Sequence, residues 1–472
     1  MTVGLLNVGV SGLRAAQVQL EVTGSNIANV DTPGFARRSA IQTSISSGGA
    51  RTLTGGEDTG GGIGVRIDRI QRSYDQFLIG DLRSTAGGAA GLGAEAEWQV
   101  ELERAIGTRD TGVAGGLARF LDSAERLAAA PTSLPLRRDM LAAGADVAAG
   151  FRETAARFAR IDDGIVADLG GALTSANQAL ESLADINRQL ARTEDGSATA
   201  TTLLDRRDSA LDALAAELPI SVEYLPQGRV GVRLANANGP KLIGEGQLST
   251  LGLGEPGADG LPTLLVDANF APRLVTIPDG GRAGARVGGL FAALAATRDA
   301  VDALDGLAAD TATLANDAHR AGVDLAGDAG LALFTAADGT PVVSAADMDW
   351  AIDAPERLAT AGAVLADGIT PTPADRDDNR NLLALIDTIG EPLTARITDQ
   401  RGRIVTASAA AQDRAGIASA AAADTRAAYQ NRTGVNLDEE AANLIRFQQG
   451  YEAAARVIQA ARETFDSLLN IR

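Results

Sequence analysis

Both ends of this 472-residue chain carry apolar residues at every seventh position. The N-terminal series is Leu6, Leu13, Leu20 and Ile27, and the C-terminal series is Leu437, Leu444, Tyr451, Ile458 and Phe465. Such a repeat predicts helices that supercoil about a partner, because a straight helix of 3.6 residues per turn drifts away from a seven-residue stripe. The partner that we expect for each terminus is the opposite terminus. In the alternative reading, each terminus is a surface helix on a globular core.

The N-terminal repeat stops abruptly. Residues 25–35 read SNIANVDTPGF. Asn29 is suited to close the helix end locally. Pro33 presets the backbone for the first central position of a turn, and Gly34 readily takes the positive φ that a type II turn requires at the second. We therefore predict a turn at Asn29, Pro33 and Gly34 that redirects the chain away from the terminal helix.

The middle of the chain reads as a helical trunk with two β-containing inserts. Three apolar stripes mark long helices, at Leu169, Ala176, Leu183 and Leu190, at Leu290, Leu294, Val301, Leu304 and Ala308, and at Ile397, Ile404 and Ala411. Apolar residues alternate over 220–224 and 230–234 on either side of a PQG turn, which predicts a β-hairpin. Residues 341–345, PVVSA, are the strand that we expect in the second insert.

The fold class that we expect is mainly α with β inserts, because apolar residues recur mostly at helical spacing. Four units are predicted, since the chain is too long for one compact domain. They are a terminal core of residues 1–80 with 430–472, a helical bundle of residues 81–212 with 283–325 and 372–429, a β-rich outer domain of residues 213–282, and a small irregular insert of residues 326–371.

Composition argues against most binding and catalytic chemistry. The chain has 61 acidic and 42 basic residues, a net charge of -19, which repels nucleic acid. It has no cysteine and one histidine, so thiol nucleophiles are excluded and zinc sites or histidine triads are hard to assemble. His319 ends a predicted helix, where positive charge is favoured. We expect no enzyme activity, no catalytic residue, no cofactor and no metal site.

Nothing in the sequence predicts membrane insertion. No segment approaches the roughly 20 consecutive apolar residues of a membrane span. The first residues, MTVGLLNVGVSGLRAAQ, lack a basic region ahead of an apolar stretch, so no cleaved signal peptide is expected. Taken alone, these features favour a cytoplasmic protein.

Several segments together resemble the flagellar axial proteins, the family of rod, hook and hook-associated proteins. SNIANVDTPGF is similar to that family's N-terminal signature, GIGVRIDRIQRSYDQFL to the segment that follows it, and residues 432–471 to the C-terminal helix. LAAAPTSLPLRRDML and TTLLDRRDSALDALAAELPISVEYLPQGRVGV narrow the resemblance to the hook-associated members. The similarity covers residues 1–235, 285–325 and 375–472, and it is weak over the two inserts.

This resemblance implies a function and a set of partners. It implies a structural subunit that joins hook to filament and packs its terminal helices against neighbouring axial subunits. The implied partners are the flagellar hook protein, hook-associated protein 3, copies of the chain in a ring, and an export chaperone with the type III export apparatus. The implied location is extracellular, without signal cleavage. Hook-associated protein 3 or another axial subunit is the near alternative, and a secreted adhesin or enzyme domain on an axial scaffold is the remote one.

Overall fold

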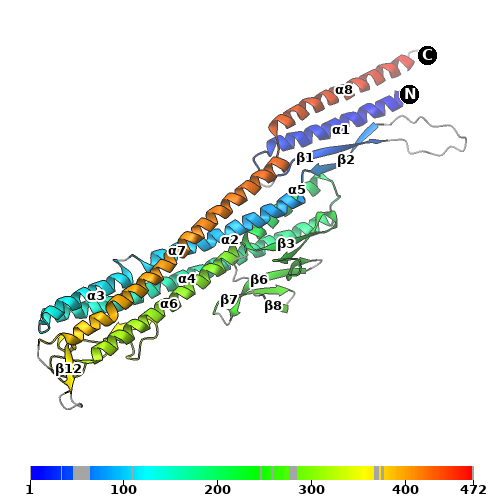
Figure 1. The fold of residues 1–472 in the computed structure, drawn as a ribbon. Helices are drawn as coiled ribbons and strands as arrows, with labels where there is room; N and C mark the ends of the chain where they lie inside the picture. The colour runs from blue at the N-terminus through cyan, green and yellow to red at the C-terminus, as the bar shows by residue number, and fades with distance from the viewer. Residues whose placement is uncertain are drawn as a thin grey trace.

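The computed structural model describes residues 2–32, 35–45, 64–108, 110–244, 247–257, 260–268, 271–275, 284–365, 371–373 and 377–469. The helices are α1 (Thr2–Ala28), α2 (Gln76–Ile106), α3 (Gly112–Ala129), α4 (Leu134–Leu190), α5 (Ala198–Glu217), α6 (Arg286–Arg320), α7 (Arg380–Thr433) and α8 (Leu437–Leu469), with short 3₁₀ turns η1 (Pro226–Gly228), η3 (Ala345–Asp347) and η4 (Pro355–Arg357). Figure 1 shows an elongated molecule with α1 and α8 at one end and both chain termini at its tip. The expected class, long helices with small sheets, is confirmed.

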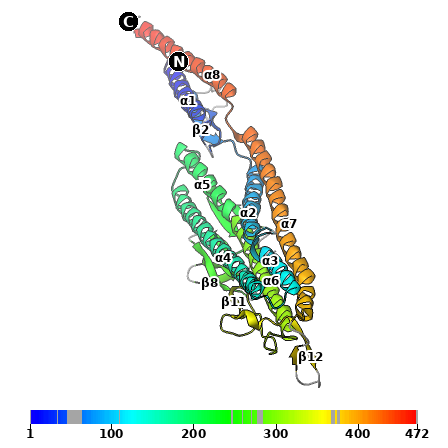
Figure 2. The same ribbon diagram turned by 90° about the vertical axis from the view of Figure 1, so that its left-hand side faces the viewer.

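A trunk of long helices makes up most of the molecule. Helix α4 packs against α3, α5 and α6, while α2 packs against α6 and α7. In Figure 2, α4 and α5 lie on one side of the trunk and α2 and α7 on the other. The predicted stripes face the core, and of their residues only Val301 is half-buried. The buried ones are Leu169, Ala176, Leu183, Leu190, Leu290, Leu294, Leu304, Ala308, Ile397, Ile404 and Ala411. Each fully buried Leu, Ile or Phe stabilises the fold by roughly 1.5–3 kcal/mol, so the buried stripes of these helices hold the trunk together.

Both tryptophans of the chain pack against glycines of α4. A Cβ on Gly144 would lie 2.2 Å from the ring of Trp350, and one on Gly164 would lie 2.6 Å from the ring of Trp98. No real side chain tolerates such distances, so only glycine lets the two large rings reach the helix backbone. Trp350 also stacks edge-on against Phe120 of α3 with ring centroids 5.9 Å apart, which fixes a residue of the second insert on the trunk.

The first insert is a six-stranded antiparallel sheet in chain order. Its strands are β3 (Ile220–Tyr224), β4 (Val230–Leu234), β5 (Lys241–Gly244), β6 (Gln247–Pro256), β7 (Pro262–Ala268) and β8 (Ala271–Val275). The predicted hairpin is confirmed, with Ile220 opposite Leu234 and Tyr224 opposite Val230. Asn177 of α4 holds the sheet on the trunk, because its side chain bonds both the N–H and the carbonyl of Leu251 in β6.

The second insert contains short strands on the far end of the trunk. They are β9 (Gly322–Val323), β10 (Phe334–Ala336), β11 (Met348–Trp350), β12 (Ala361–Leu365) and β13 (Pro371–Pro373). The strand predicted at 341–345 is wrong. Asp305 of α6 accepts a hydrogen bond from the Ala345 N–H at 2.7 Å, and the Ser344 hydroxyl accepts one from the Ala346 N–H. The two side chains thus accept hydrogen bonds from backbone N–H groups that a strand would donate to a neighbouring strand, and the segment forms a 3₁₀ turn instead.

Arg137 of α4 anchors this insert from inside the protein. Its side chain is fully buried and donates to the carbonyls of Pro131, Pro355 and Leu358 and to the hydroxyl of Thr360. Burial lowers the pKa of Arg137 to about 10, which leaves the guanidinium charged at neutral pH. A buried charge surrounded by neutral acceptors ties the segment at 355–360 to the start of α4.

The helices extend across two of the predicted domain boundaries. Helix α2 begins before residue 81 and α7 continues beyond residue 429. Strand β12 pairs with β9, which precedes residue 326. The division of the chain into four domains therefore stays a prediction. No helix in the described ranges combines the length and the apolar character that crossing a membrane requires.

Candidate assembly interface

Helices α1 and α8, here called the terminal pair, lie side by side and antiparallel (Figure 1). Gly9 near the start of α1 lies against Ile458 late in α8, and Asn26 near the end of α1 contacts Glu440 at the start of α8. A Cβ on Gly9 would lie 2.7 Å from Cγ1 of Ile458, so glycine permits the close approach. The structure therefore brings the two termini together. Supercoiling of the pair stays a prediction.

Small side chains occupy the centre of the terminal pair. Ala15, Ala16, Val22 and Thr23 of α1 are buried, as are Ala454 and Ala461 of α8. The predicted seam residues lie on the flanks of this contact. Leu13, Leu20, Ile27, Leu444 and Ile458 are half-buried, whereas Leu6, Leu437, Tyr451 and Phe465 are exposed by 38%, 51%, 39% and 50%. The large apolar groups are thus only partly covered within one molecule.

The end of α1 is held by local hydrogen bonds. The Asn29 side chain donates to the Ser25 carbonyl at 2.8 Å and its Oδ1 accepts from the Thr32 hydroxyl at 3.2 Å. Asn29 therefore sits where a helix-closing residue is expected. Pro33 and Gly34 lie outside the described residues, so the predicted turn type stays a prediction.

A buried polar network behind the terminal pair was missed by sequence reasoning. The Asn26 amide bonds both the N–H and the carbonyl of Arg38, and it also donates to Oε2 of Glu440 at 3.1 Å. Oε1 of Glu440 accepts from Arg37 Nε at 2.7 Å. Glu440 is 1% exposed, so this carboxylate is fully committed to the network. The network connects α1, α8 and the chain between α1 and β1 at a single point.

Asp438, Glu439 and Glu440 lie in the first turn of α8, and from the sequence alone they are explained as favourable partners of the helix dipole. A buried network would have been indicated only by considering Glu440 together with Asn26 and Arg37, which lie about 400 residues earlier in the chain. Only the fold places these groups within hydrogen-bond distance, so the pattern was not recognisable beforehand.

Two strands continue from α1 toward the trunk. Strand β1 (Arg38–Ile45) pairs antiparallel with β2 (Gly64–Arg72). In the sequence, Ile63, Val65 and Ile67 alternate with polar or small residues and predict a strand, which β2 confirms, whereas β1 was not predicted. Val65 N–H donates to the Ser11 hydroxyl at 3.2 Å, which ties the hairpin to α1. The Ile70 N–H donates to the Gly196 carbonyl at 3.0 Å, which ties it to the loop before α5.

An arginine–aspartate cluster joins these strands to α5. It consists of Arg38, Arg72, Arg83, Arg207, Asp205, Asp208 and Asp212. Asp205 pairs with Arg38 and lies 2.9 Å from Arg72, while Asp208 lies 2.8 Å from Arg72 and 2.6 Å from Arg207. Arg83 of α2 pairs with Asp212 at 2.7 Å. The acidic residues recur one and two turns apart along one side of α5, so a single helix face receives charges from three other elements.

The buried position of the cluster changes its titration. Burial raises the pKa of Asp205, although Arg72 and Arg38 oppose this effect. Burial also acts to raise the pKa of Asp208, but Arg207, Arg72 and Arg83 outweigh it, and the pKa of Asp208 is lowered. Burial and a 2.6 Å hydrogen bond to Tyr224 raise the pKa of Tyr74. Asp208, which pairs with three arginines of the cluster, is therefore the carboxylate whose charge the cluster favours most.

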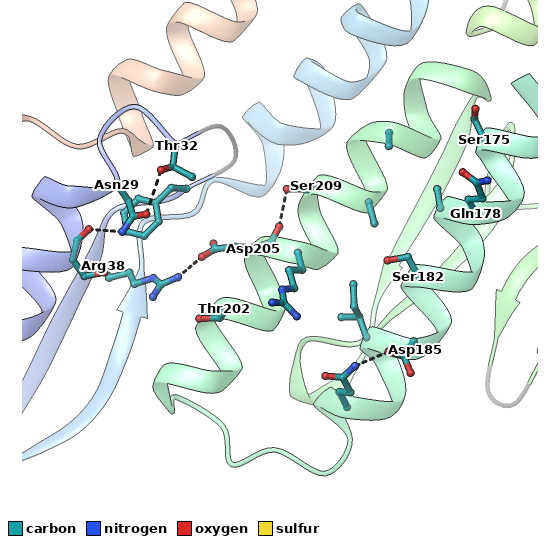
Figure 3. Close-up of a pocket in the computed structure, with 18 residues that line it drawn as sticks. Asn29, Thr32, Arg38, Ser175, Gln178, Ser182, Asp185, Thr202, Asp205 and Ser209 are labelled. Carbon is teal, nitrogen blue, oxygen red and sulfur yellow. Dashed lines mark hydrogen bonds and ion pairs between the residues drawn. The ribbon is translucent and has the colours of Figure 1, made fainter.

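A groove opens between the end of α1 and the helices α4 and α5, with a volume of about 910 Å³. Figure 3 shows Asn29, Thr32 and Arg38 on one side of it, with Thr202, Asp205 and Ser209 of α5 and Ser182 and Asp185 of α4 across from them. Phe35, Ile186 and Ala210 add apolar surface. The groove lies at the junction between the terminal elements and the trunk.

Comparisons with known proteins identify the family. Residues 100–334 match the family model for the helical domain of flagellar hook-associated protein FlgK. Residues 6–35 match the model for the flagella basal body rod protein, and residues 426–471 the C-terminal model of the basal body rod FlgEFG proteins. The chain belongs to the flagellar hook-associated protein 1 family. Members of this family are structural proteins of the hook–filament junction, and the chain is accordingly a structural subunit of the flagellum.

The relatives cover nearly the whole chain. Flagellar hook-associated protein 1 of Escherichia coli strain K12 is 25% identical over 99% of this chain and 100% of the relative. The protein of the same name from Bacillus subtilis strain 168 is 25% identical over 97% of this chain and 96% of the relative. The structure of the flagellar hook junction protein FlgK from Burkholderia pseudomallei matches with a TM-score of 0.63 and 14% identity, over 74% of this chain and 99% of that one, which supports the fold.

His319 has a structural position. Its Nε2 accepts a hydrogen bond from the Ala359 N–H at 2.8 Å, so Nδ1 carries the proton and donates to the Leu331 carbonyl at 2.6 Å. Burial lowers the pKa of His319 to about 4, which keeps the ring neutral at neutral pH. The expectation of a favoured positive charge at this helix end is wrong, because the cost of desolvating the charge outweighs the helix dipole. Among the described residues, no cluster of three or more His, Asp or Glu side chains could hold a metal ion.

Proposed function

We propose that the terminal pair is the assembly element of this junction subunit, and that neighbouring axial subunits cover its exposed apolar side chains. The single observation that carries this proposal is the distribution of size and exposure. Small residues fill the contact between α1 and α8, while Leu437, Ile445, Tyr451 and Phe465 of α8 stay 39–55% exposed. Full burial of such a side chain is worth roughly 1.5–3 kcal/mol, and a partner surface can supply the part of that burial that one molecule leaves unmade.

The proposed neighbours follow from membership in the family. They are the flagellar hook protein on one side, hook-associated protein 3 on the other, and copies of this chain in a ring. Contacts between non-identical faces of successive copies generate a closed ring when the rotation closes. The chain would reach this extracellular position by type III export with a chaperone, without signal cleavage. We propose no catalytic activity for it.

Substitution of exposed apolar residues tests the proposal. Tyr451→Ser with Phe465→Ser should abolish incorporation of the purified chain at hook ends and the motility of cells that carry the variant. The matched control is Ile417→Ser with Val343→Ser, because these side chains are 73% and 75% exposed outside the terminal pair. Urea denaturation should give the same unfolding midpoint for both variants. Normal incorporation of the first variant would refute the proposal.

Hydrogen exchange provides a second test. Most helical stability comes from tertiary packing, and the contact between α1 and α8 buries mainly small side chains, so the amides of Leu13 and Ile458 should exchange fast in the monomer and slowly in assembled junctions. Strong protection in the monomer would contradict the requirement for neighbours.

The turn after α1 provides a third test. Pro33→Ala with Gly34→Val should impair assembly and leave the trunk folded, because these substitutions remove the residues on which the predicted turn depends. Normal junctions in this double variant would remove the turn from the mechanism.

A further inference from the structure

We infer that Phe77 of one subunit enters the groove of the next copy in the ring. This inference rests on the proposed ring and identifies its lateral contact. Phe77 lies in the first turn of α2 and is 90% exposed, more than any other large apolar side chain among the described residues. A fully exposed phenylalanine on a rigid helix is costly to hydrate, and it supplies a large apolar contact when a partner covers it.

The surface around Phe77 is shaped for a close contact. Asp81 lies one turn further along α2, on the same side of the helix, and is exposed. Gly80 lies between them, and a Cβ added there would meet no atom within 4 Å. The carboxylate of Asp81 has no ion-pair partner in the part of the chain that the structure describes. Phe77 and Asp81 therefore project together from a flat stretch of helix.

The groove offers the complementary chemistry. Most of its lining is polar and includes two carboxylates, Asp185 and Asp205, each of which pairs with an arginine of its own chain. Phe35, Ile186 and Ala210 contribute apolar surface, and Arg206 contributes a cation. Arg206 is exposed and forms no ion pair with any described residue. A cavity of on the order of 150 Å³ is enough to hold a benzene ring. At about 910 Å³, the groove has room for the phenyl ring together with part of the helix that carries it.

Phe77 does not reach the groove of its own chain. Thr202, Arg206 and Ser209 of α5 line the groove, whereas Asp208 and Asp212 on another side of the same helix pair with Arg83 of α2. Phe77 itself is 90% exposed and is not among the residues that line the groove of its own chain. In the inferred contact a second copy supplies the aromatic ring, and two different faces meet, as a closed ring requires.

Cross-linking tests this contact without altering Phe77. The chain has no cysteine, so thiols introduced by Gly80→Cys and Ala213→Cys are the only ones present. Gly80 adjoins Phe77, and Ala213 is an exposed residue of the groove. Treatment of junctions assembled on hook ends with a short bis-maleimide should give a ladder of dimers and larger multimers. The free monomer should give none.

The control pairs Ala213→Cys with Ile417→Cys, because Ile417 of α7 is also exposed. Junctions that assemble normally but give a ladder no stronger than this control would overturn the Phe77 contact and leave the terminal-pair proposal intact. Failure of the unmodified chain to join hook ends would instead refute the proposed function.

A charge exchange provides a second measurement that does not depend on thiols. Asp81→Arg should weaken incorporation several-fold, because it places two cations at one contact. Adding Arg206→Asp should restore incorporation, since the exchanged charges pair again. Incorporation of the double variant no better than that of Asp81→Arg would also overturn the inference.

Discussion

The trunk and the terminal pair are both built from long helices, but they bury different parts of their apolar stripes. In the trunk, large side chains such as Phe158, Ile165 and Leu180 are fully buried within one molecule. In the terminal pair, alanine and glycine fill the contact while large side chains remain at its flanks. The comparison teaches that one kind of repeat can encode either a finished core or a surface that is completed only by other subunits.

The polar groups of the two regions differ in the same way. In the trunk, Arg137 and His319 are buried and fix an insert onto the helices. At the base of the terminal pair, Glu440 joins segments from both ends of the chain, and the arginine–aspartate cluster connects the strands that follow α1 to α5. Buried polar groups thus set position in both places, whereas apolar burial within one molecule stabilises mainly the trunk.

The largest effect that we predict is a difference in stability between two variants, each of which truncates one phenylalanine, one in the trunk and one in the terminal pair. Phe158→Ala should lower the free energy of unfolding of the monomer by about 3–5 kcal/mol, because it leaves a cavity in the core. Phe465 is 50% exposed. Phe465→Ala should therefore change the free energy of unfolding by less than about 0.5 kcal/mol, while it reduces assembly. Urea denaturation of both variants measures this. Equal losses would mean that the two regions do not differ as described.

Acid should weaken the trunk through His319, the only histidine of the chain. The folded-state pKa of about 4 lies below the ordinary value of 6.5, so the unfolded state binds the proton first as the pH falls. The stabilisation is present above pH 6.5 and is lost between pH 6.5 and 4, by up to about 3 kcal/mol.

The measurement for this prediction is the free energy of unfolding of the trunk against pH, with His319→Gln as the comparison. The variant should be less stable at pH 7 and should lose less stability between pH 6.5 and 5. Parallel pH profiles of the two proteins would exclude His319 as the source. Hydrogen bonds from Arg380 lower the pKa of Asp378 to about 2. The stability that depends on Asp378 is therefore lost at a lower pH than the stability that depends on His319, and it does not affect this comparison.

A smaller effect separates two glycines of the terminal pair. Gly9→Ala should push α1 away from Ile458 and cost about 1–3 kcal/mol of helix association. At Gly12 an added Cβ would lie 3.6 Å from the Cβ of Ala454, an ordinary contact, so Gly12→Ala should be neutral or stabilising by up to about 1 kcal/mol. Thermal release of each variant from assembled junctions is the readout, and identical release temperatures would contradict the close approach at Gly9.

Prediction from sequence succeeded where a signal is periodic and local. The stripes at Leu169–Leu190 and Ile397–Ala411 placed the trunk helices, and alternation over 220–234 placed a hairpin. It failed where side chains compete for backbone donors, as Asp305 does at Ala345. It also missed β1, since residues 38–45 alternate weakly and pair with a strand far along the chain.

The sequence by itself determined that both termini are helical, that their apolar residues repeat every seven positions, and that the first helix closes near Asn29. Only the tertiary structure decided that small residues form the centre of the terminal pair and that Asn26, Arg37 and Glu440 meet behind it. The physical reason is range. Helix periodicity arises from neighbours a few residues apart, whereas a buried hydrogen bond between residues 26 and 440 depends on how the whole chain between them is folded.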